Sequence, residues 1–227
     1  MGGNKKLTQV YMMPGMAANP SIFEHINLPK DEFDIHWLNW IIPKKNESLL
    51  GYAKRICEDI PKEPCVLIGV SFGGVLVQEM AKYLEVSRLI IISSVKHKEE
   101  LPLKMKLARK TGVYKMIPTS LAGYLGELER FPVPPAAKKR ARLYKQYLSV
   151  SNKHYLDWAI QEIICWDQAE APQDIIHIHG DKDPVFPVKY INDAIVIPEG
   201  THIMIINRYK WFNKHLPSLI RTGFCAE

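Results

Sequence analysis

The sequence is poor in cysteine and contains no long hydrophobic run. Its four cysteines, Cys57, Cys65, Cys165 and Cys225, form no CxxC pair and have no metal-ligand spacing with histidine. This pattern argues against a disulfide framework and a zinc site, so we expect free thiols, a reducing compartment and a cytoplasmic protein. No apolar run approaches the roughly 18 residues that a membrane helix needs. The opening segment MGGNKKLTQV lacks the apolar core of a signal peptide, and we expect no integral membrane segment.

Positive charge is concentrated in one part of the chain. The 227 residues carry a net charge of +6, and 47% of them are hydrophobic, which fits one globular domain, or one domain with a sizeable insertion. Between Lys96 and Lys153, 14 lysine or arginine residues stand against 4 aspartate or glutamate residues. We interpret this surplus either as solvated helix faces or as a field that attracts an anionic substrate. The basic run at 138–142 has no nucleic-acid motif around it, so we expect no nucleic-acid partner.

Strand and helix patterns alternate outside the basic segment. Six strands are expected, at residues 7–13, 33–41, 65–70, 88–92, 174–180 and 193–198. Amphipathic helices are expected at 46–60 and 74–84, with a closing helix at 204–220. This order predicts an α/β fold with a mostly parallel six-stranded sheet and helices on both faces. Residues 94–171 have helical spacing and no convincing strand, so we expect a helical cap inserted into a core formed by residues 1–93 and 172–227.

A serine between glycines follows the third expected strand. GVSFG at 69–73 matches G-x-S-x-G, with a strand before it and a helix after it. Exposing the hydroxyl of Ser71 above the sheet requires a strained backbone at a sharp turn, and glycines on either side avoid collisions across that turn. Ser71 is therefore the candidate nucleophile.

A serine nucleophile needs a histidine base and an acid at the same edge of the sheet. His202 follows the last expected strand, at the carboxyl ends of the parallel strands, and is the candidate base. His177 and His179 lie within a strand, where packed imidazoles are the expected reading. Two acids follow the same strand; we assign the acid to Asp183, and expect Asp181 to brace the turn by accepting backbone N–H groups.

An oxyanion hole would complete such a site. One donor should be the backbone N–H of Phe72, directly after the serine. The second should come from the loop after the first strand, where Gly15 permits close approach and leaves the N–H of Met16 as donor. Taken alone, the Pro-Gly pair in this loop would read as a plain surface turn.

Taken together, these motifs resemble those of the α/β-hydrolase superfamily. The order Ser71, Asp183, His202 is that of the family, and PGM, GVSFGG, HGDKDP and EGTH fall where its functional loops fall. The sequence departs from the family in having Pro14 where a histidine is frequent, and in lacking two amino-terminal strands of larger members. The resemblance implies hydrolysis of a carboxylic ester, thioester or lactone through an acyl-enzyme, with no metal or organic cofactor. Carbon–carbon bond hydrolysis, acyl transfer and non-catalytic ligand binding are the alternatives on the same fold.

The cap is expected to roof the site and to define the substrate pocket. The residues we expect to line it are Gly15, Met105, Tyr124, Trp158 and Trp166. Taken singly, each large side chain among them is better explained by core packing. Together they indicate a small-molecule substrate with an apolar acyl or aromatic chain rather than a sugar or phosphate, while the natural substrate and the oligomeric state stay open.

Overall fold

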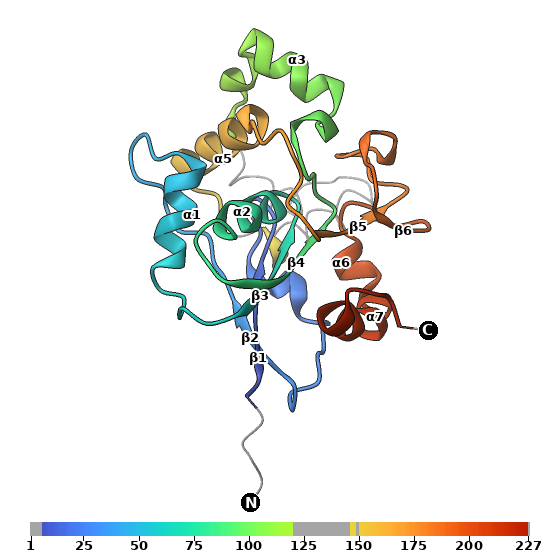
Figure 1. Cartoon of the computed structure of the whole chain (residues 1–227). Helices are drawn as coiled ribbons and strands as arrows, with labels where there is room; N and C mark the ends of the chain where they lie inside the picture. Colours follow the sequence, from blue (N-terminus) through green and yellow to red (C-terminus); the bar gives the residue numbers. More distant parts are fainter. Residues whose placement is uncertain (1–5, 120–145, 149, 227) are drawn as a thin grey trace, which may run out of the picture.

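The computed structural model describes residues 6–119, 146–148 and 150–226 (Figure 1). Six strands form one sheet in the order β2-β1-β3-β4-β5-β6, and every neighbouring pair is parallel. The strands are β1 Thr8–Met13, β2 Phe33–Trp37, β3 Cys65–Val70, β4 Val86–Ile92, β5 Ile176–Gly180 and β6 Ile195–Ile197. All six expected strands are present. β2 ends four residues before the expected boundary because the chain leaves the sheet there and Trp40 packs into the core.

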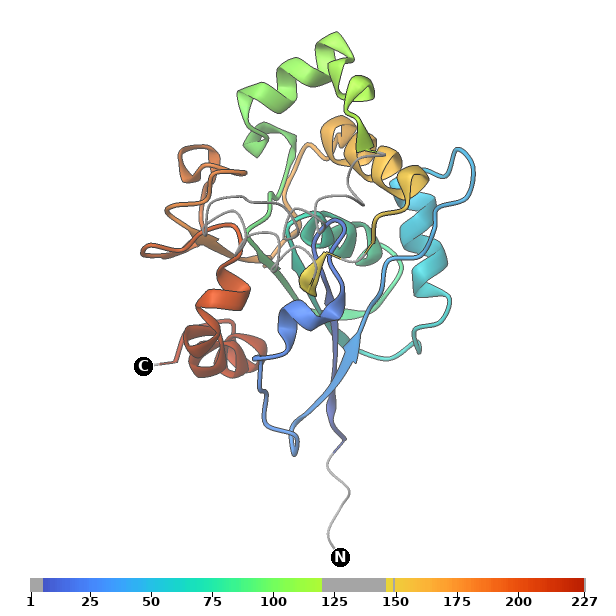
Figure 2. The same cartoon turned by 180° about the vertical axis from the view of Figure 1, so that it is seen from behind.

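Helices cover both faces of the sheet. The α-helices are α1 Leu49–Cys57, α2 Phe72–Met80, α3 Leu103–Thr111, α5 Lys153–Cys165, α6 Met204–Asn207 and α7 Tyr209–Thr222. Short 3₁₀ turns are η1 Pro20–Phe23, η2 Lys98–Glu100, η3 Val113–Met116 and η5 Val188–Tyr190. Figures 1 and 2 show α1, α2 and α5 on one side of the sheet and α6 and α7 on the other.

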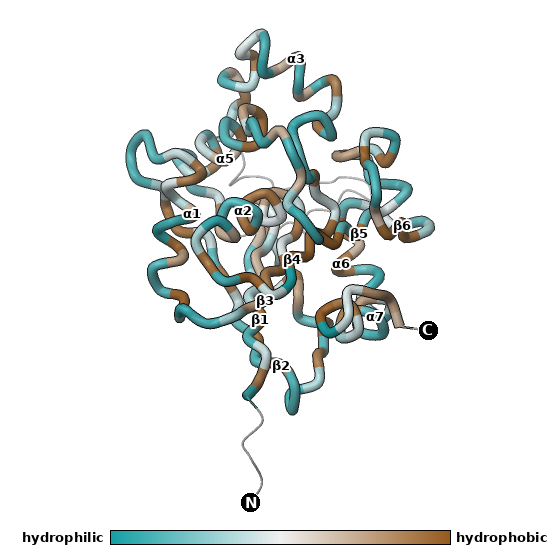
Figure 3. The backbone as a smooth tube through the Cα atoms, viewed as in Figure 1, coloured by the Kyte–Doolittle hydropathy of each residue, from teal (hydrophilic) through white to brown (hydrophobic). Residues whose placement is uncertain are grey.

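Alternation along the strands builds two separate hydrophobic cores. In β1, Tyr11 and Met13 join the core under α1, α2 and α5, while Val10 and Met12 join the core under η1, α6 and α7. Successive side chains of a strand point to opposite faces, so a strand buried on both faces is apolar throughout. In Figure 3, where the tube is coloured by the hydropathy of each residue, the central strands are mostly hydrophobic and much of the outer loops is hydrophilic.

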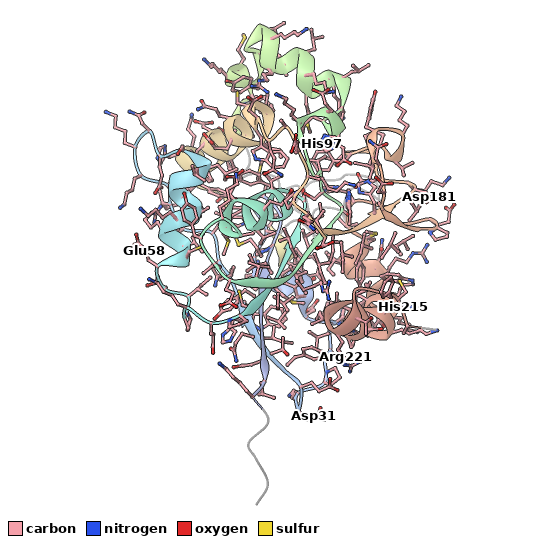
Figure 4. All side chains as sticks on the ribbon, in the orientation of Figure 1. Asp31, Glu58, His97, Asp181, His215 and Arg221 are labelled. Carbon is pink, nitrogen blue, oxygen red and sulfur yellow. The ribbon has the colours of Figure 1, made fainter. Side chains whose placement is uncertain are left out.

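The closing helix differs from its expected form. Instead of one helix over 204–220, the structure has α6 and α7, with a break at Arg208, whose φ of −114° and ψ of 20° are not helical. The guanidinium of Arg208 donates to the carbonyl of Glu199 at 3.2 Å, back toward β6. At the other end of α7, Arg221 forms a two-point ion pair with Glu32, and Figure 4 shows Arg221 near Asp31.

The described part of the chain between β4 and β5 is helical, as expected, and contains no strand. It does not form a core of its own, because the buried side chains of α5 belong to the core shared with α1 and α2. α3 has no buried residue. The boundaries of a separate cap, at residues 94 and 171, stay a prediction.

Two sequence expectations concern compartment and membrane. All four cysteines are unpaired, which is the state expected under reducing conditions; the cytoplasmic location stays a prediction. Among the helices of the described residues, none combines the length and the apolarity that crossing a bilayer requires.

Strand order reverses between β1 and β3, and the loops that matter for function leave the sheet there. From β1 the chain continues to β2 on one side, and β3 lies on the other side with Met13 paired to Gly69. Loops that leave adjacent parallel strands in opposite directions open a crevice at their carboxyl ends. Pro14 and Ser71 both lie at this edge.

Two glycines bring the loops after β5 and β6 into contact. A Cβ on Gly180 would lie 2.2 Å from the carbonyl oxygen of Gly200. The amide of Lys182 donates to that same oxygen at 2.9 Å. This approach places the loop that bears Asp183 directly beside the loop that bears His202.

Replacing Gly180 with alanine should therefore separate these loops. We expect Gly180→Ala to lower the free energy of unfolding by about 2–3 kcal/mol or more, because the added methyl meets backbone rather than a flexible side chain. Urea denaturation measures the change. Gly51→Ala is the matched control. Gly51 lies in α1, where a Cβ would meet only side-chain atoms, Ser48 Oγ at 3.4 Å and Glu47 Cγ at 3.8 Å, and alanine should stabilise the helix by up to about 1 kcal/mol. Equal effects of the two substitutions would contradict the steric explanation.

Candidate active site

Ser71 occupies a strained turn between β3 and α2. Its φ of 54° and ψ of −123° lie in a region that non-glycine residues rarely adopt. Four hydrogen bonds of its backbone hold it there. Its N–H donates to Ile92 O at 2.9 Å, and its carbonyl accepts from Gly74 N at 2.8 Å, Val75 N at 3.4 Å and Ser94 Oγ at 2.7 Å. The turn is thus fixed by β4 as well as by its own helix.

The glycines on either side of Ser71 are required by close backbone contacts. A Cβ on Gly69 would lie 2.3 Å from Gly73 O, and a Cβ on Gly73 would lie 2.3 Å from Pro14 O. No side chain fits at either position without moving the backbone. The second contact also ties the loop after β1 to the serine turn.

His202 and Asp183 lie in line with Ser71. His202 Nε2 is 2.9 Å from Ser71 Oγ, and His202 Nδ1 is 2.8 Å from Asp183 Oδ2. Because a carboxylate only accepts, Nδ1–H donates to Asp183 and the bare Nε2 accepts from the serine hydroxyl. The Asp183 side chain is fully buried and that of His202 is 21% exposed. This is the hydrogen-bonded order that activates a serine hydroxyl.

The roles of Asp183 and Asp181 differ from those expected. The other oxygen of Asp183, Oδ1, accepts from the N–H groups of Val185 at 2.8 Å and Phe186 at 3.0 Å. Asp183 therefore orients the histidine and braces its own turn. Asp181 was expected to brace the turn; its buried Oδ1 instead has no hydrogen-bond partner among the described residues.

The loop after β1 lies against Ser71 with free backbone donors. A Cβ on Gly15 would lie 3.3 Å from Ser71 Cβ. The backbone N–H groups of Met16 and Phe72 donate no hydrogen bond to any described residue. Met16 and Phe72 both line the cavity that opens at Ser71, so each N–H is available to a bound group.

A cavity of about 780 Å³ opens at Ser71 and His202. Of the expected pocket residues, Gly15 and Met105 line it. Most of its other walls are apolar, contributed by residues that the sequence analysis missed, including Ile22, Tyr147, Ile160, Ile163, Phe186, Ile203 and Ile206. Ile203 and Ile206 belong to the apolar run that directly follows His202, and that run is the sequence signal that could have found them. Tyr124 lies outside the described residues.

Two expected pocket residues lie elsewhere. Trp158 and Trp166 are not among the described residues that line the cavity. Trp158 donates its indole N–H to Glu47 O at 2.7 Å, and Trp166 donates to Glu79 Oε1 at 2.9 Å. A buried indole turns its N–H toward an acceptor, and these acceptors lie near α1 and in α2, away from the cavity.

Lys182 is a charged cavity residue that the sequence analysis also missed. It lies between the two acid candidates in HGDKDP, and its ammonium group is 3.7 Å from Glu199 Oε1. Among the described residues, no group of three or more histidine, cysteine or acidic side chains is arranged to hold a metal ion.

The arrangement of strands and helices is similar to that of solved esterases. An esterase from Thermogutta terrifontis has a TM-score of 0.64 at 14% identity, and the match covers 94% of this chain and 89% of that one. An esterase from Exiguobacterium antarcticum has a TM-score of 0.65 at 17% identity, covering 95% and 92%. The N-acyl homoserine lactone degrading enzyme Est816 has a TM-score of 0.61 at 17% identity, covering 96% and 93%. No protein-family model and no curated protein matches the sequence.

The chain has the α/β-hydrolase fold. The fold predicted from the motifs is thereby confirmed. The matches to the two esterases cover 94% and 95% of this chain, so the likeness extends beyond the sheet.

Behind the acid loop of this α/β-hydrolase fold lie two buried histidines of β5. His179 Nε2–H donates to Phe186 O at 2.8 Å, which leaves its Nδ1 to accept from His177 Nε2–H at 3.2 Å. Burial lowers the pKa of His177 well below 6.5, and burial is also the main cause that lowers the pKa of His179. The neighbouring charges of Lys96, Asp183 and Glu100 modify these shifts but do not reverse them. Both imidazoles are neutral at neutral pH.

This pair predicts a loss of stability in acid. In the unfolded chain both histidines titrate near 6.5, so below that pH the unfolded state binds more protons than the folded state. The contribution of this pair to the free energy of unfolding should be fully present above about pH 6.5. As the pH falls below about 6.5, the free energy of unfolding should decrease by up to about 1.4 kcal/mol per pH unit for each imidazole.

Urea denaturation at about pH 5 and about pH 7.5 measures this dependence. His177→Gln should flatten it. His25→Gln, at a side chain that is 52% exposed, is the control and should leave it unchanged. If His177→Gln and the wild type lose the same stability between the two pH values, the buried pair is not the cause.

Proposed function

We propose that this protein hydrolyses carboxylic esters, thioesters or lactones through an acyl-enzyme formed on Ser71. The observation that carries the proposal is the continuous series of hydrogen bonds from Asp183 through His202 to Ser71, at 2.8 and 2.9 Å. The series ends at the mouth of an apolar cavity. The similarity to esterases and to a lactone-degrading enzyme supports the same reaction class.

In the proposed reaction, Ser71 Oγ attacks the substrate carbonyl carbon while its proton passes to His202 Nε2. The buried carboxylate of Asp183 stabilises the imidazolium, and the N–H groups of Phe72 and Met16 donate to the oxyanion. The bond to the leaving oxygen or sulfur then breaks as His202 returns the proton to it. A water molecule, deprotonated by His202, attacks the acyl-enzyme; the carboxylic acid leaves and Ser71 regains its proton.

The cavity supports an apolar acyl group as substrate. Its volume of about 780 Å³ is in the range of small-molecule sites, and isoleucine, methionine and phenylalanine side chains form most of its walls. Few polar side chains other than Ser71 and His202 line it, so the cavity disfavours a substrate that places a sugar there.

The triad can be tested with a fluorophosphonate probe and a short-chain nitrophenyl ester. Wild-type protein should be labelled and Ser71→Ala should not. Asp183→Asn should lower kcat by about 10⁴-fold, because an amide at this position favours the wrong histidine tautomer.

Asp181→Asn is the matched control, since Asp181 makes no hydrogen bond with His202; its kcat should stay within about threefold of the wild type. Folded wild-type protein that neither takes up the probe nor turns over esters would indicate a ligand-binding protein instead.

An anionic substrate is the finer part of the proposal, and Lys182 supports it. Several basic residues of the middle segment have acidic partners: Lys98 and Arg109 contact Asp167, and Lys106 contacts Glu99. Lys182 also has an acidic neighbour, Glu199 at 3.7 Å, but it differs from these residues in lining the cavity, one residue from Asp183. His202 protonates the leaving group, so a cation on the same side of the cavity favours an alcohol or thiol that carries negative charge.

This preference can be measured with two esters of one acyl chain, one with a neutral alcohol and one with a carboxylate on the alcohol. Lys182→Gln should lower the ratio of kcat/KM for the anionic over the neutral ester by about two- to fivefold, the size expected for an exposed charge. Glu199→Gln should raise the ratio, because it removes the anion 3.7 Å from the lysine. Both effects should shrink at high salt. A ratio that neither substitution moves would contradict the anionic preference.

A further inference from the structure

The loop that bears Met16 is held from outside by three hydrogen bonds. Trp40 Nε1–H donates to Gly15 O at 2.7 Å. The N–H of Ala17 donates to the hydroxyl of Tyr155 at 3.2 Å, and the carbonyl of Ala17 accepts from Val150 N at 3.1 Å. The peptide groups on both sides of Met16 are thus tied to distant parts of the chain.

The loop needs this support because its backbone is strained. Ala17 has a φ of 63°, in the left-handed region that favours glycine. A non-glycine residue stays in such a conformation only where its surroundings enforce it. The direction of the Met16 N–H therefore depends on Trp40 and Tyr155 as well as on the loop itself.

Trp40 also contacts the other proposed donor, Phe72, and Tyr155 packs against Trp40. The ring of Trp40 stacks on the ring of Phe72, with centroids 5.2 Å apart and planes 8° apart. Tyr155 packs against Trp40 at 5.4 Å, and Trp158 meets Phe72 edge-on at 5.9 Å. Tyr155 is 0% exposed and Phe72 is 1% exposed. One aromatic cluster, Trp40, Phe72, Tyr155 and Trp158, therefore includes one proposed donor residue and bonds to the residues on either side of the other, Met16.

We propose that Trp40 and Tyr155 are positioning residues of the oxyanion hole, so that α5 sets the geometry of the hole in addition to walling the cavity. The inference rests on the proposed acyl-transfer function. Figures 1 and 2 show α5 beside α1 and over α2, and its Tyr155 reaches the loop after β1. Neither side chain touches the reacting atoms; each acts through the backbone of the loop.

Tyr52 provides a matched control for Tyr155. Its side chain is equally buried, and its ring packs against Trp158 at 4.5 Å and Trp40 at 6.2 Å. Its hydroxyl, however, bonds to the backbone of Ile41, accepting from the N–H and donating to the carbonyl, both at 3.0 Å. Tyr52→Phe and Tyr155→Phe each remove one buried hydroxyl and keep the ring, but only Tyr155→Phe releases the oxyanion loop.

The experiment measures kcat and KM for a nitrophenyl ester, the affinity for an alkyl boronic acid, and thermal unfolding. The boronic acid accepts Ser71 Oγ at boron and places an oxygen in the hole, so it reports on the transition-state geometry. We expect Tyr155→Phe and Trp40→Phe to lower kcat by about ten- to a hundredfold, part of the loss seen when a whole oxyanion donor is removed. KM should change by less than about twofold, and boronate affinity should fall in proportion to kcat/KM.

Tyr52→Phe should keep kcat and boronate affinity within about twofold of the wild type, whatever it does to the melting temperature. If Tyr52→Phe and Tyr155→Phe lower kcat equally, or Tyr155→Phe changes KM alone, the positioning role is wrong while the proposed function stands. An inactive, unlabelled wild type would overturn the proposed function itself.

Discussion

Ser71 can hold a positive φ only because three separate parts of the chain meet around it. Ile92 of β4 accepts from the N–H of Ser71, and the hydroxyl of Ser94, two residues after the end of β4, donates to the carbonyl of Ser71. The loop after β1 approaches so closely that Gly73 has room for no side chain. This strained turn sits where strand order reverses between β1 and β3, and the crevice, the cavity and the histidine loop are all arranged around the hydroxyl that it exposes.

The acid and histidine loops are matched to this turn by backbone contact and buried hydrogen bonds. Gly180 and Gly200 bring the two loops together, and Asp183 divides its two oxygens between the histidine and its own loop. Behind it, neutral His177 donates to neutral His179, and His179 donates to the carbonyl of Phe186. The N–H of Phe186 in turn donates to Asp183. The orientation of one carboxylate thus depends on a hydrogen-bonded series that reaches into the interior of β5.

The two described α-helices between β4 and β5 differ in how they are tied to the rest of the fold. α5 is part of the core shared with α1 and α2, and through Tyr155 it contacts the loop after β1. α3 buries none of its residues, and Leu103 and Leu107 are 67% and 62% exposed. Substitutions in α5 therefore act on core packing and on the site together, whereas most of α3 is free to vary without disturbing the core, since exposed positions contribute little to stability.

Local patterns in the sequence determined the strands, their parallel arrangement and the order of Ser71, Asp183 and His202. Apolar runs, glycine spacing and turn residues follow from interactions between near neighbours, and parallel strands bring their carboxyl ends to one edge of a sheet whatever the remaining packing. Only the tertiary structure decided which way Trp158 and Trp166 turn, that Asp183 rather than Asp181 braces its loop, that the last helix breaks at Arg208, and that Lys182 lines the cavity. It also brought Tyr155 to Ala17, 138 positions away along the chain. These features depend on which partners a buried polar group finds in distant parts of the chain. The hydrophobic periodicity of the sequence does not identify those partners.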